Sequence, residues 1–134
     1  MIGPMEITIL LQPMGGPRRR TLAPALVVQM ADRGNPFADD LDFYAVVTLL
    51  NHLGLPCGQP MGTATEEGTL DSTRRWVVFE FDDLAVDQPG WYKFSVQIFA
   101  RGNAMNPRPV SFGTESTDHV IRIESRVNAD SSTC

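Results

Sequence analysis

The sequence predicts an all-β fold, a sandwich or barrel built from many short strands with few or no helices. Apolar residues come in short bursts, and clusters of Gly, Pro, Asn and Asp separate these bursts. Several bursts are rich in β-branched and aromatic residues, which favour strands over helices. At 134 residues the chain is large enough for one hydrophobic core and small for two. We therefore expect one domain over residues 1–127 and a disordered tail over residues 128–134.

The N-terminal part of the chain predicts three strands. The first covers Met5–Leu11, where isoleucines alternate with other residues, and a run of Pro and Gly ends it. The second covers positions 26–30 and is almost entirely apolar. The third covers positions 43–50, and its β-branched and aromatic content favours a strand over a helix.

Less regular sequence separates the third strand from the next one. Residues 51–55 are compatible with a short helical turn. Positions 56–73 are rich in Gly, Thr and Glu and contain few apolar residues. They predict a long surface loop, with one weak strand near Met61.

Two strands in the C-terminal half show the most regular alternation, at positions 75–81 and 91–99. Their apolar faces are expected to meet in the core. Positions 119–124 predict a last strand at a sheet edge, where its charges discourage unwanted pairing. The predicted core faces consist of Val77, Phe79 and Phe81 in the first strand and of Tyr92, Phe94, Val96 and Ile98 in the second.

A tyrosine follows a turn at the start of the second of these strands. Residues 82–92 contain this turn, which is followed by a Gly-X-Tyr sequence at positions 90–92. In immunoglobulin-like sandwiches, a tyrosine at such a corner donates a hydrogen bond to the preceding loop and fixes the crossover between the sheets. We therefore predict this bond for Tyr92, which favours an immunoglobulin-like sandwich.

Charge and cysteine content narrow the function classes. The formal net charge is −5, and Lys93 is the single lysine, so the surface as a whole is not built for a polyanion. A local arginine cluster can still attract phosphate, because charges interact over only about 8 Å at physiological salt. The two cysteines form no disulfide framework, no apolar run approaches a membrane span of roughly 20 residues, and a signal peptide is lacking. We expect a soluble protein in a reducing compartment.

A series of specific segments runs through the chain. An arginine pair, a proline-containing stretch and an apolar-Val-Gln-apolar strand come first, followed by Asn-Pro-Phe. Two blocks similar to FPDLSV and GxYRLxFxLF come next, and elements similar to EST and vRIR end the series. The segments are residues 19–30, 35–37, 79–86, 90–99, 115–117 and 120–123. In this order they resemble the fungal velvet family, from about Met5 to about Arg126.

The resemblance implies a Rel-type β-sandwich, related to the DNA-binding half of Rel-type transcription factors. It further implies pairing with itself or with other velvet proteins, a nuclear location with shuttling to the cytoplasm left open, and control of spore development and secondary metabolism. The segments between positions 12 and 18 and between positions 108 and 115 are shorter here than in the family. This shortening leaves a second function open, a protein-interaction module that pairs but has reduced or lost DNA binding.

Arginines are the candidate DNA-binding residues. Arg18, Arg19 and Arg20 follow the Gly/Pro-rich segment, where guanidinium groups are free to reach phosphate oxygens. The alternative interpretation is a solvated charge run at the entry to a strand. Arg101 and Arg108 are secondary candidates, because they lie in a later loop that is expected at the same end of the sandwich. Three arginines bind phosphate weakly, so useful DNA affinity requires pairing.

The two histidines and their neighbours do not predict catalysis. His52 and His119 have no Cys or His at metal-ligand spacing, so a zinc site is not expected. Ser116, Asp118 and His119 include the residue types of a catalytic triad. They lie too close together in sequence to point at a common atom, and we expect solvated polar residues instead.

Metal and nucleotide binding also have little support. The acidic cluster of Asp39, Asp40 and Asp42 lacks the spacing and terminal glutamate of an EF-hand. Residues 15–16 form a Gly-Gly pair without the Lys-Ser/Thr of a phosphate loop. We therefore expect no enzyme, no metal, no cofactor and no small-molecule substrate.

Overall fold

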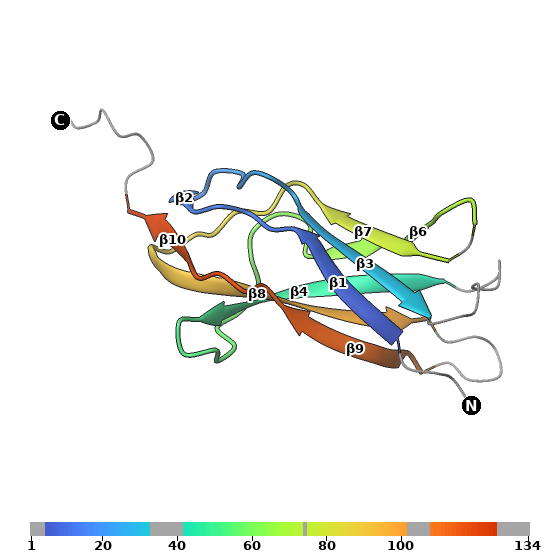
Figure 1. Ribbon diagram of the computed structural model, residues 1–134. Helices are drawn as coiled ribbons and strands as arrows, with labels where there is room; N and C mark the ends of the chain where they lie inside the picture. Colours follow the sequence, from blue (N-terminus) through green and yellow to red (C-terminus); the bar gives the residue numbers. More distant parts are fainter. Residues whose placement is uncertain (1–4, 33–41, 74, 102–107, 126–134) are drawn as a thin grey trace.

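The computed structural model describes residues 5–32, 42–73, 75–101 and 108–125, whose arrangement is shown in Figure 1. These residues form ten strands and no helix, and so none that could span a membrane. The strands make two sheets that enclose one hydrophobic core. The predicted all-β sandwich is thus confirmed, whereas the predicted tail at 128–134 lies outside the described residues.

One sheet has four strands, which pair antiparallel throughout. Its order is β1-β3-β7-β6, so strands from distant parts of the chain become neighbours. Val28 of β3 lies opposite Ile9 of β1 and Phe79 of β7, which brings the apolar positions to one face. The strands are β1 (Met5–Leu11), β3 (Leu26–Asp32), β7 (Val77–Phe81) and β6 (Thr69–Leu70).

The other sheet has six strands, and the long strand β8 is central to it. Its order is β2-β10-β8-β4-β5, and β9 also pairs with β8. β9 lies along the C-terminal half of β8 and β10 along its beginning, so they share one edge of that strand. The strands are β2 (Gly16–Pro17), β10 (Ile121–Glu124), β8 (Gly90–Ala100), β4 (Phe43–Asn51), β5 (Thr65–Glu67) and β9 (Val110–Ser116).

Thr117 joins the two strands that share this edge. It is buried, and its hydroxyl accepts a hydrogen bond of 3.0 Å from the N–H of Phe94. Its own N–H donates to the Phe94 carbonyl at 2.8 Å. Thr117 therefore keeps the backbone of β8 satisfied at the point where the edge passes from β9 to β10.

The core consists of inward side chains from both sheets. Phe79 of β7 is 0% exposed and Phe94 of β8 is 1% exposed, and both belong to the same apolar cluster. The predicted alternation is confirmed at the buried residues Val77, Phe79 and Phe81 of β7 and Phe94, Val96 and Ile98 of β8. Tyr92 is only partly buried, although it packs against the core. Burying such rings stabilises the fold by about 1.5–3 kcal/mol per side chain.

Tyr92 makes the predicted corner bond. Its hydroxyl donates to the carbonyl oxygen of Gln88 at 3.1 Å, which ties the start of β8 to the preceding loop. Burial raises the pKa of the Tyr92 phenol, and the nearby Cys57 and Asp87 add to this effect. The ring also packs against the core, so the tyrosine links the loop to the sandwich.

Residues 51–55 form a tight turn and not the helical turn considered above. The Asn51 side chain accepts hydrogen bonds from the N–H groups of Leu53 at 2.9 Å and Leu55 at 3.1 Å. Gly54 has a φ of +83°, a conformation that glycine adopts without strain. The side-chain bonds of Asn51 offer the backbone an alternative to helical pairing.

The prediction of one long loop at positions 56–73 is wrong. This segment contains β5 and β6, which belong to different sheets. The weak strand expected near Met61 is present only as an isolated bridge between Met61 and Ala85. Gly68 lies between the two short strands, and its backbone packs against the core: a Cβ there would lie 2.8 Å from a ring atom of Phe79. Glycine thus permits the crossing between the sheets.

The start of one predicted strand and the edge position of another also need correction. β7 begins at Val77, because the Asp71 carboxylate accepts hydrogen bonds from the N–H groups of Arg75 and Trp76 and holds them in a turn. The last strand is not at the edge of its sheet, since Ile123 pairs in parallel with Gly16 of β2.

Candidate functional site

Residues 18–20 form an exposed turn directly after β2, which we call the arginine turn. Figure 1 shows β2 at the end of the molecule where β10 ends and β8 begins. The N–H of Arg18 donates to the carbonyl of Glu124 at 3.0 Å, and the N–H of Arg19 donates to the carbonyl of Val86 at 2.8 Å. The backbone of the arginine turn is therefore attached to both neighbouring segments.

Arg19 forms an ion pair with Asp87. Its φ of +65° lies in the left-handed region, which non-glycine residues seldom adopt. Its Nε lies 2.5 Å from Oδ1 of Asp87, and 55% of its side chain is exposed. Hydrogen bonds from Arg19 and Gln88 lower the pKa of the Asp87 carboxyl, and the charges of Arg19 and Arg18 add to this effect. The carboxylate thus stays ionised and occupies one arginine of the turn.

The other two arginines of the turn have different surroundings. Arg18 is partly buried, and its Nε is buried without a hydrogen-bond partner in the described part of the chain. Arg20 is exposed, and no ion pair holds its side chain within the described residues. An exposed guanidinium of this kind is available to an external anion.

Arg101 lies at the opposite end of the sandwich, which contradicts the expected convergence with the arginine turn. It follows the last residue of β8, whereas the arginine turn lies beside the first. The 11 residues of β8 extend over about 36 Å at 3.3 Å per residue. Arg101 and the arginine turn therefore do not lie at the same end of the sandwich.

Arg101 also has internal partners that compensate its charge. Its Nε lies 3.1 Å from Oδ2 of Asp42, and its Nη2 contacts the carboxylate of Glu67. The guanidinium stacks over the ring of Tyr44, 4.6 Å from the ring centroid. These contacts link the end of β8 to β4 and β5, so Arg101 stabilises this end of the sheet.

Arg108 is exposed in a bend just before β9. The first residue of β9, Val110, lies opposite Ala100 at the end of β8, so Arg108 lies near the same end as Arg101. Of the acidic cluster considered for calcium, Asp39 and Asp40 lie outside the described residues, and Asp42 is paired with Arg101.

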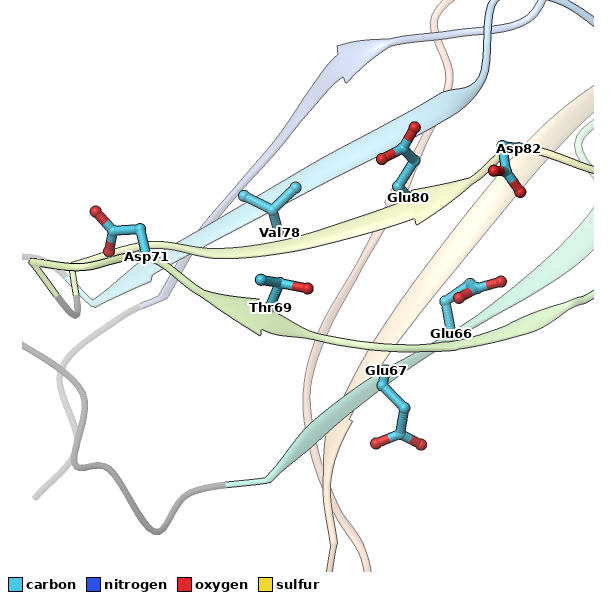
Figure 2. Close-up of a pocket in the computed structure, with 7 residues that line it drawn as sticks. All are labelled: Glu66, Glu67, Thr69, Asp71, Val78, Glu80 and Asp82. Atoms are coloured by element: carbon cyan, nitrogen blue, oxygen red, sulfur yellow. The ribbon is translucent and has the colours of Figure 1, made fainter.

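A second feature, not anticipated from the sequence, is an acidic groove of about 480 Å³. Figure 2 shows that Glu80 and Asp82 come from β7 and the residue after it, and that Glu66 of β5 lies near them. Burial raises the pKa of Glu66, and the surrounding carboxylates, Asp83 first among them, raise it further. The lining residues are Glu66, Glu67, Thr69, Asp71, Val78, Glu80 and Asp82.

The acidic groove could not be predicted because its carboxylates are far apart in sequence. They come together only when β5 and β6 pair with different sheets, and these two short strands were predicted as loop. The carboxylates of the groove oppose the binding of phosphate on that face.

The residues considered for catalysis lie near the break between β9 and β10. Ser116 ends β9, and Asp118 and His119 follow it on the surface; no hydrogen bond joins the three in the described residues. His52 is exposed in the turn after β4. Within the described ranges, no group of three or more His, Cys, Asp or Glu side chains is arranged to hold a metal ion.

Comparisons with known proteins give no assignment: no family model matches this chain, and no curated protein matches it.

Proposed function

We propose that this chain is a velvet-like regulator that acts as a pair and contacts the DNA backbone through the arginine turn. The observation that supports this proposal most is the arginine turn itself. Three consecutive arginines lie on a backbone that is hydrogen-bonded on both sides, and Arg20 extends from it into solvent. A backbone that is already ordered loses little entropy when its side chains bind an anion.

The small number of phosphate contacts per chain favours a paired molecule. Each neutralised phosphate contributes a slope of about −0.9 to log K against log salt, so three arginines give about −2.7 per chain. Since Asp87 already holds Arg19, the slope falls to about −1.8 for two arginines and to about −0.9 if Arg20 alone reaches a phosphate. Two chains double these values, and the second contact benefits from the high effective concentration that the first one creates.

The nuclear location, the control of spore development and secondary metabolism, and the choice of velvet proteins as partners belong to the same proposal. They rest on the resemblance of residues 19–30, 79–86 and 90–99 to the velvet motifs. The sandwich fold is compatible with them but hosts many unrelated functions, so the fold does not decide between them.

The test is DNA affinity across a range of salt concentrations. The variant with Arg18, Arg19 and Arg20 changed to Ala should bind a duplex much more weakly and with a flatter salt slope. Asp87→Ala should steepen the slope by up to about 0.9 per chain, because it frees Arg19. The matched control pair is Arg20→Ala and Arg75→Ala, because each removes one exposed arginine and Arg75 lies outside the arginine turn and is not a DNA-binding candidate.

An unchanged affinity and slope in the triple variant would remove the arginine turn from the mechanism. Equal losses in Arg20→Ala and Arg75→Ala would show attraction by overall charge and no local contact. Fluorescence anisotropy of a labelled duplex measures both quantities.

A second candidate function is a protein-interaction module that pairs but does not bind DNA. Arg19 and Arg101 already have carboxylate partners in the chain, which supports this alternative. Co-purification with a full-length velvet protein, together with absent DNA binding at low salt, would favour the module over the regulator.

A further inference from the structure

An exposed tryptophan lies at the start of β8, on the outer side of the six-stranded sheet. Phe94, Val96 and Ile98 of β8 are buried, so the alternate residues, Trp91 and Lys93 among them, point away from the core. Trp91 is 53% exposed. Within the described residues the hydrophobic core does not include it. The indole is therefore available to a partner.

Two cations flank Trp91 on the same side of the sheet. Arg122 of β10 lies directly opposite Trp91, and its guanidinium carbon is 5.9 Å from the centroid of the ring, within the range of a cation–π contact. Ile121 and Ile123 are buried, so Arg122 points outward as Trp91 does. Lys93 follows Trp91 by two residues and points the same way. We call Trp91, Lys93 and Arg122 the tryptophan platform.

The two cations of the tryptophan platform are not compensated by ion pairs. In the described part of the chain no ion pair holds Lys93 or Arg122, whereas Arg19 and Arg101 are each held by carboxylates. One carboxylate, that of Glu124, lies two residues from Arg122 on the same side of β10. Two cations beside one carboxylate leave this surface positive, although the net charge of the chain is −5. An anion is therefore attracted locally.

The tryptophan platform is adjacent to the arginine turn. β10 lies between β8 and β2, and the arginine turn follows β2 directly. Two strand spacings of about 4.8 Å separate β8 from β2, so the backbones that carry the two basic surfaces are about 10 Å apart. Figure 1 shows the start of β8, the end of β10 and β2 at one end of the molecule. One short segment of a polyanion can therefore contact both surfaces.

The aromatic ring indicates which polyanion fits the tryptophan platform. Phosphate groups alone need only the cations and gain little from an indole. Every nucleobase has a flat face that stacks on an aromatic ring, and proteins use such stacking to bind single strands with little regard to sequence. In a duplex these faces are covered by the neighbouring bases, whereas in an unpaired segment they are accessible. An indole between two cations therefore favours an unpaired strand.

We propose that the tryptophan platform binds an unpaired strand of nucleic acid, next to the duplex contact of the arginine turn. Trp91 stacks on one base, and Lys93 and Arg122 neutralise neighbouring phosphates. This inference rests on the proposed function for the position of the nucleic acid. It extends that function to junctions between paired and unpaired segments.

Stacking and charge contribute to the affinity in ways that salt separates. Each phosphate neutralised on a single strand contributes about −0.7 to the slope of log K against log salt, so Lys93 and Arg122 together contribute about −1.4. Stacking on Trp91 releases no counterions and adds affinity without changing the slope. The aromatic and the cationic parts of the site therefore have different signatures.

The first test is the affinity for a short labelled oligothymidine across a range of salt concentrations, measured by fluorescence anisotropy. Trp91→Ala should weaken binding about tenfold at every salt concentration and leave the slope unchanged. Lys93→Ala combined with Arg122→Ala should flatten the slope by about 1.4. An oligouridine of the same length compares RNA with DNA, and stacking of either on Trp91 supports the inference.

The matched control is Trp76→Ala. Trp76 is also exposed, at 42%, but its N–H donates to the carboxylate of Asp71, which lines the acidic groove in the other part of the molecule. This variant should bind the oligonucleotide as the wild type does. Thermal unfolding of all variants shows that each is folded when its affinity is measured.

Tryptophan fluorescence gives a second and more local readout, because the chain has two tryptophans. In Trp76→Phe the remaining emission comes from Trp91, and the stacked base should quench it. In Trp91→Phe the remaining emission comes from Trp76 and should not change when the oligonucleotide is added.

Equal affinities of Trp91→Ala and the wild type, or unquenched emission in Trp76→Phe, would overturn the inference. Duplex binding through the arginine turn without oligonucleotide binding would also overturn it and leave the proposed function intact. Oligonucleotide binding through Trp91 without duplex binding would support the inference and refute the proposed function. Binding to vesicles that contain phosphatidylserine, without oligonucleotide binding, would assign the platform to a membrane surface and would overturn the inference as well.

Discussion

The three consecutive arginines of the arginine turn differ in burial and in ion pairing. Arg18 is partly buried, and Arg19 forms an ion pair with Asp87. Arg20 is exposed, and no ion pair within the described residues occupies its side chain, so it is free to contact an anion. These differences come from the neighbours that each side chain meets and not from the residue type. Counting arginines in the sequence therefore overestimates the number that a phosphate can reach.

Tyr92 gives a test at the residue scale. Tyr92→Phe removes the hydrogen bond to the Gln88 carbonyl and should lower the free energy of unfolding by about 0.5–1.5 kcal/mol. Urea denaturation at pH 7 measures the change. Tyr44→Phe is the control, because the Tyr44 ring is stacked but no hydrogen bond of its hydroxyl is found in the described residues.

The same tyrosine gives a pH dependence with a defined sign. Burial raises the pKa of Tyr92 above its usual value of 10.0, so the folded chain retains the phenol proton where the unfolded chain loses it. This contribution to stability is complete below pH 10 and disappears as the pH rises through the pKa of the folded state. Tyr92→Phe should lose this part of the alkaline destabilisation; an identical alkaline decline in both proteins would contradict the assignment.

At the scale of elements, regular alternation was the most reliable guide. β4, β7 and β8 were predicted because each buries every second residue against one core. The two-residue strands β2 and β6 were missed, because a pair of residues cannot show a period. β2 in particular lies in a Gly/Pro segment, and its pairing depends on the close approach of Gly15 to the backbone of Arg122.

The candidate site was only partly predictable for a similar reason. The exposed position of Arg19 and Arg20 follows from the local Gly/Pro-rich sequence. The partners of Arg101 do not, because Asp42 and Glu67 come from segments that only the sheet brings together. Local chemistry was visible in the sequence, whereas long-range contacts required the fold.

Gly68 gives a test at the element scale. Gly68→Ala places a methyl group against Val77 and Phe79, at the point where the chain passes from β5 to β6, and should cost about 1–3 kcal/mol. Gly16→Ala is the matched control, since its added methyl would meet only a side-chain atom of Leu22 at 3.9 Å. Thermal unfolding compares the two; equal stabilities would show that the crossing tolerates a side chain.

The acidic and the basic surface of the molecule lie at different places. The acidic groove lies along β5, β6 and β7, and the arginine turn lies at one end beside β2. With a net charge of −5, long-range attraction of DNA is weak, so the proposed DNA binding must come from local contacts. Two paired copies would present two arginine turns to one duplex.

The central claim, a paired molecule that holds DNA through the arginine turn, is tested most directly by the mass of its complex with a short duplex. Analytical ultracentrifugation at low salt should show two 14.8 kDa chains on one duplex, and the complex should dissociate as salt is raised. The variant with Arg18, Arg19 and Arg20 changed to Ala should stay paired and leave the duplex free. A single wild-type chain on the duplex, or no complex at low salt, would contradict the claim.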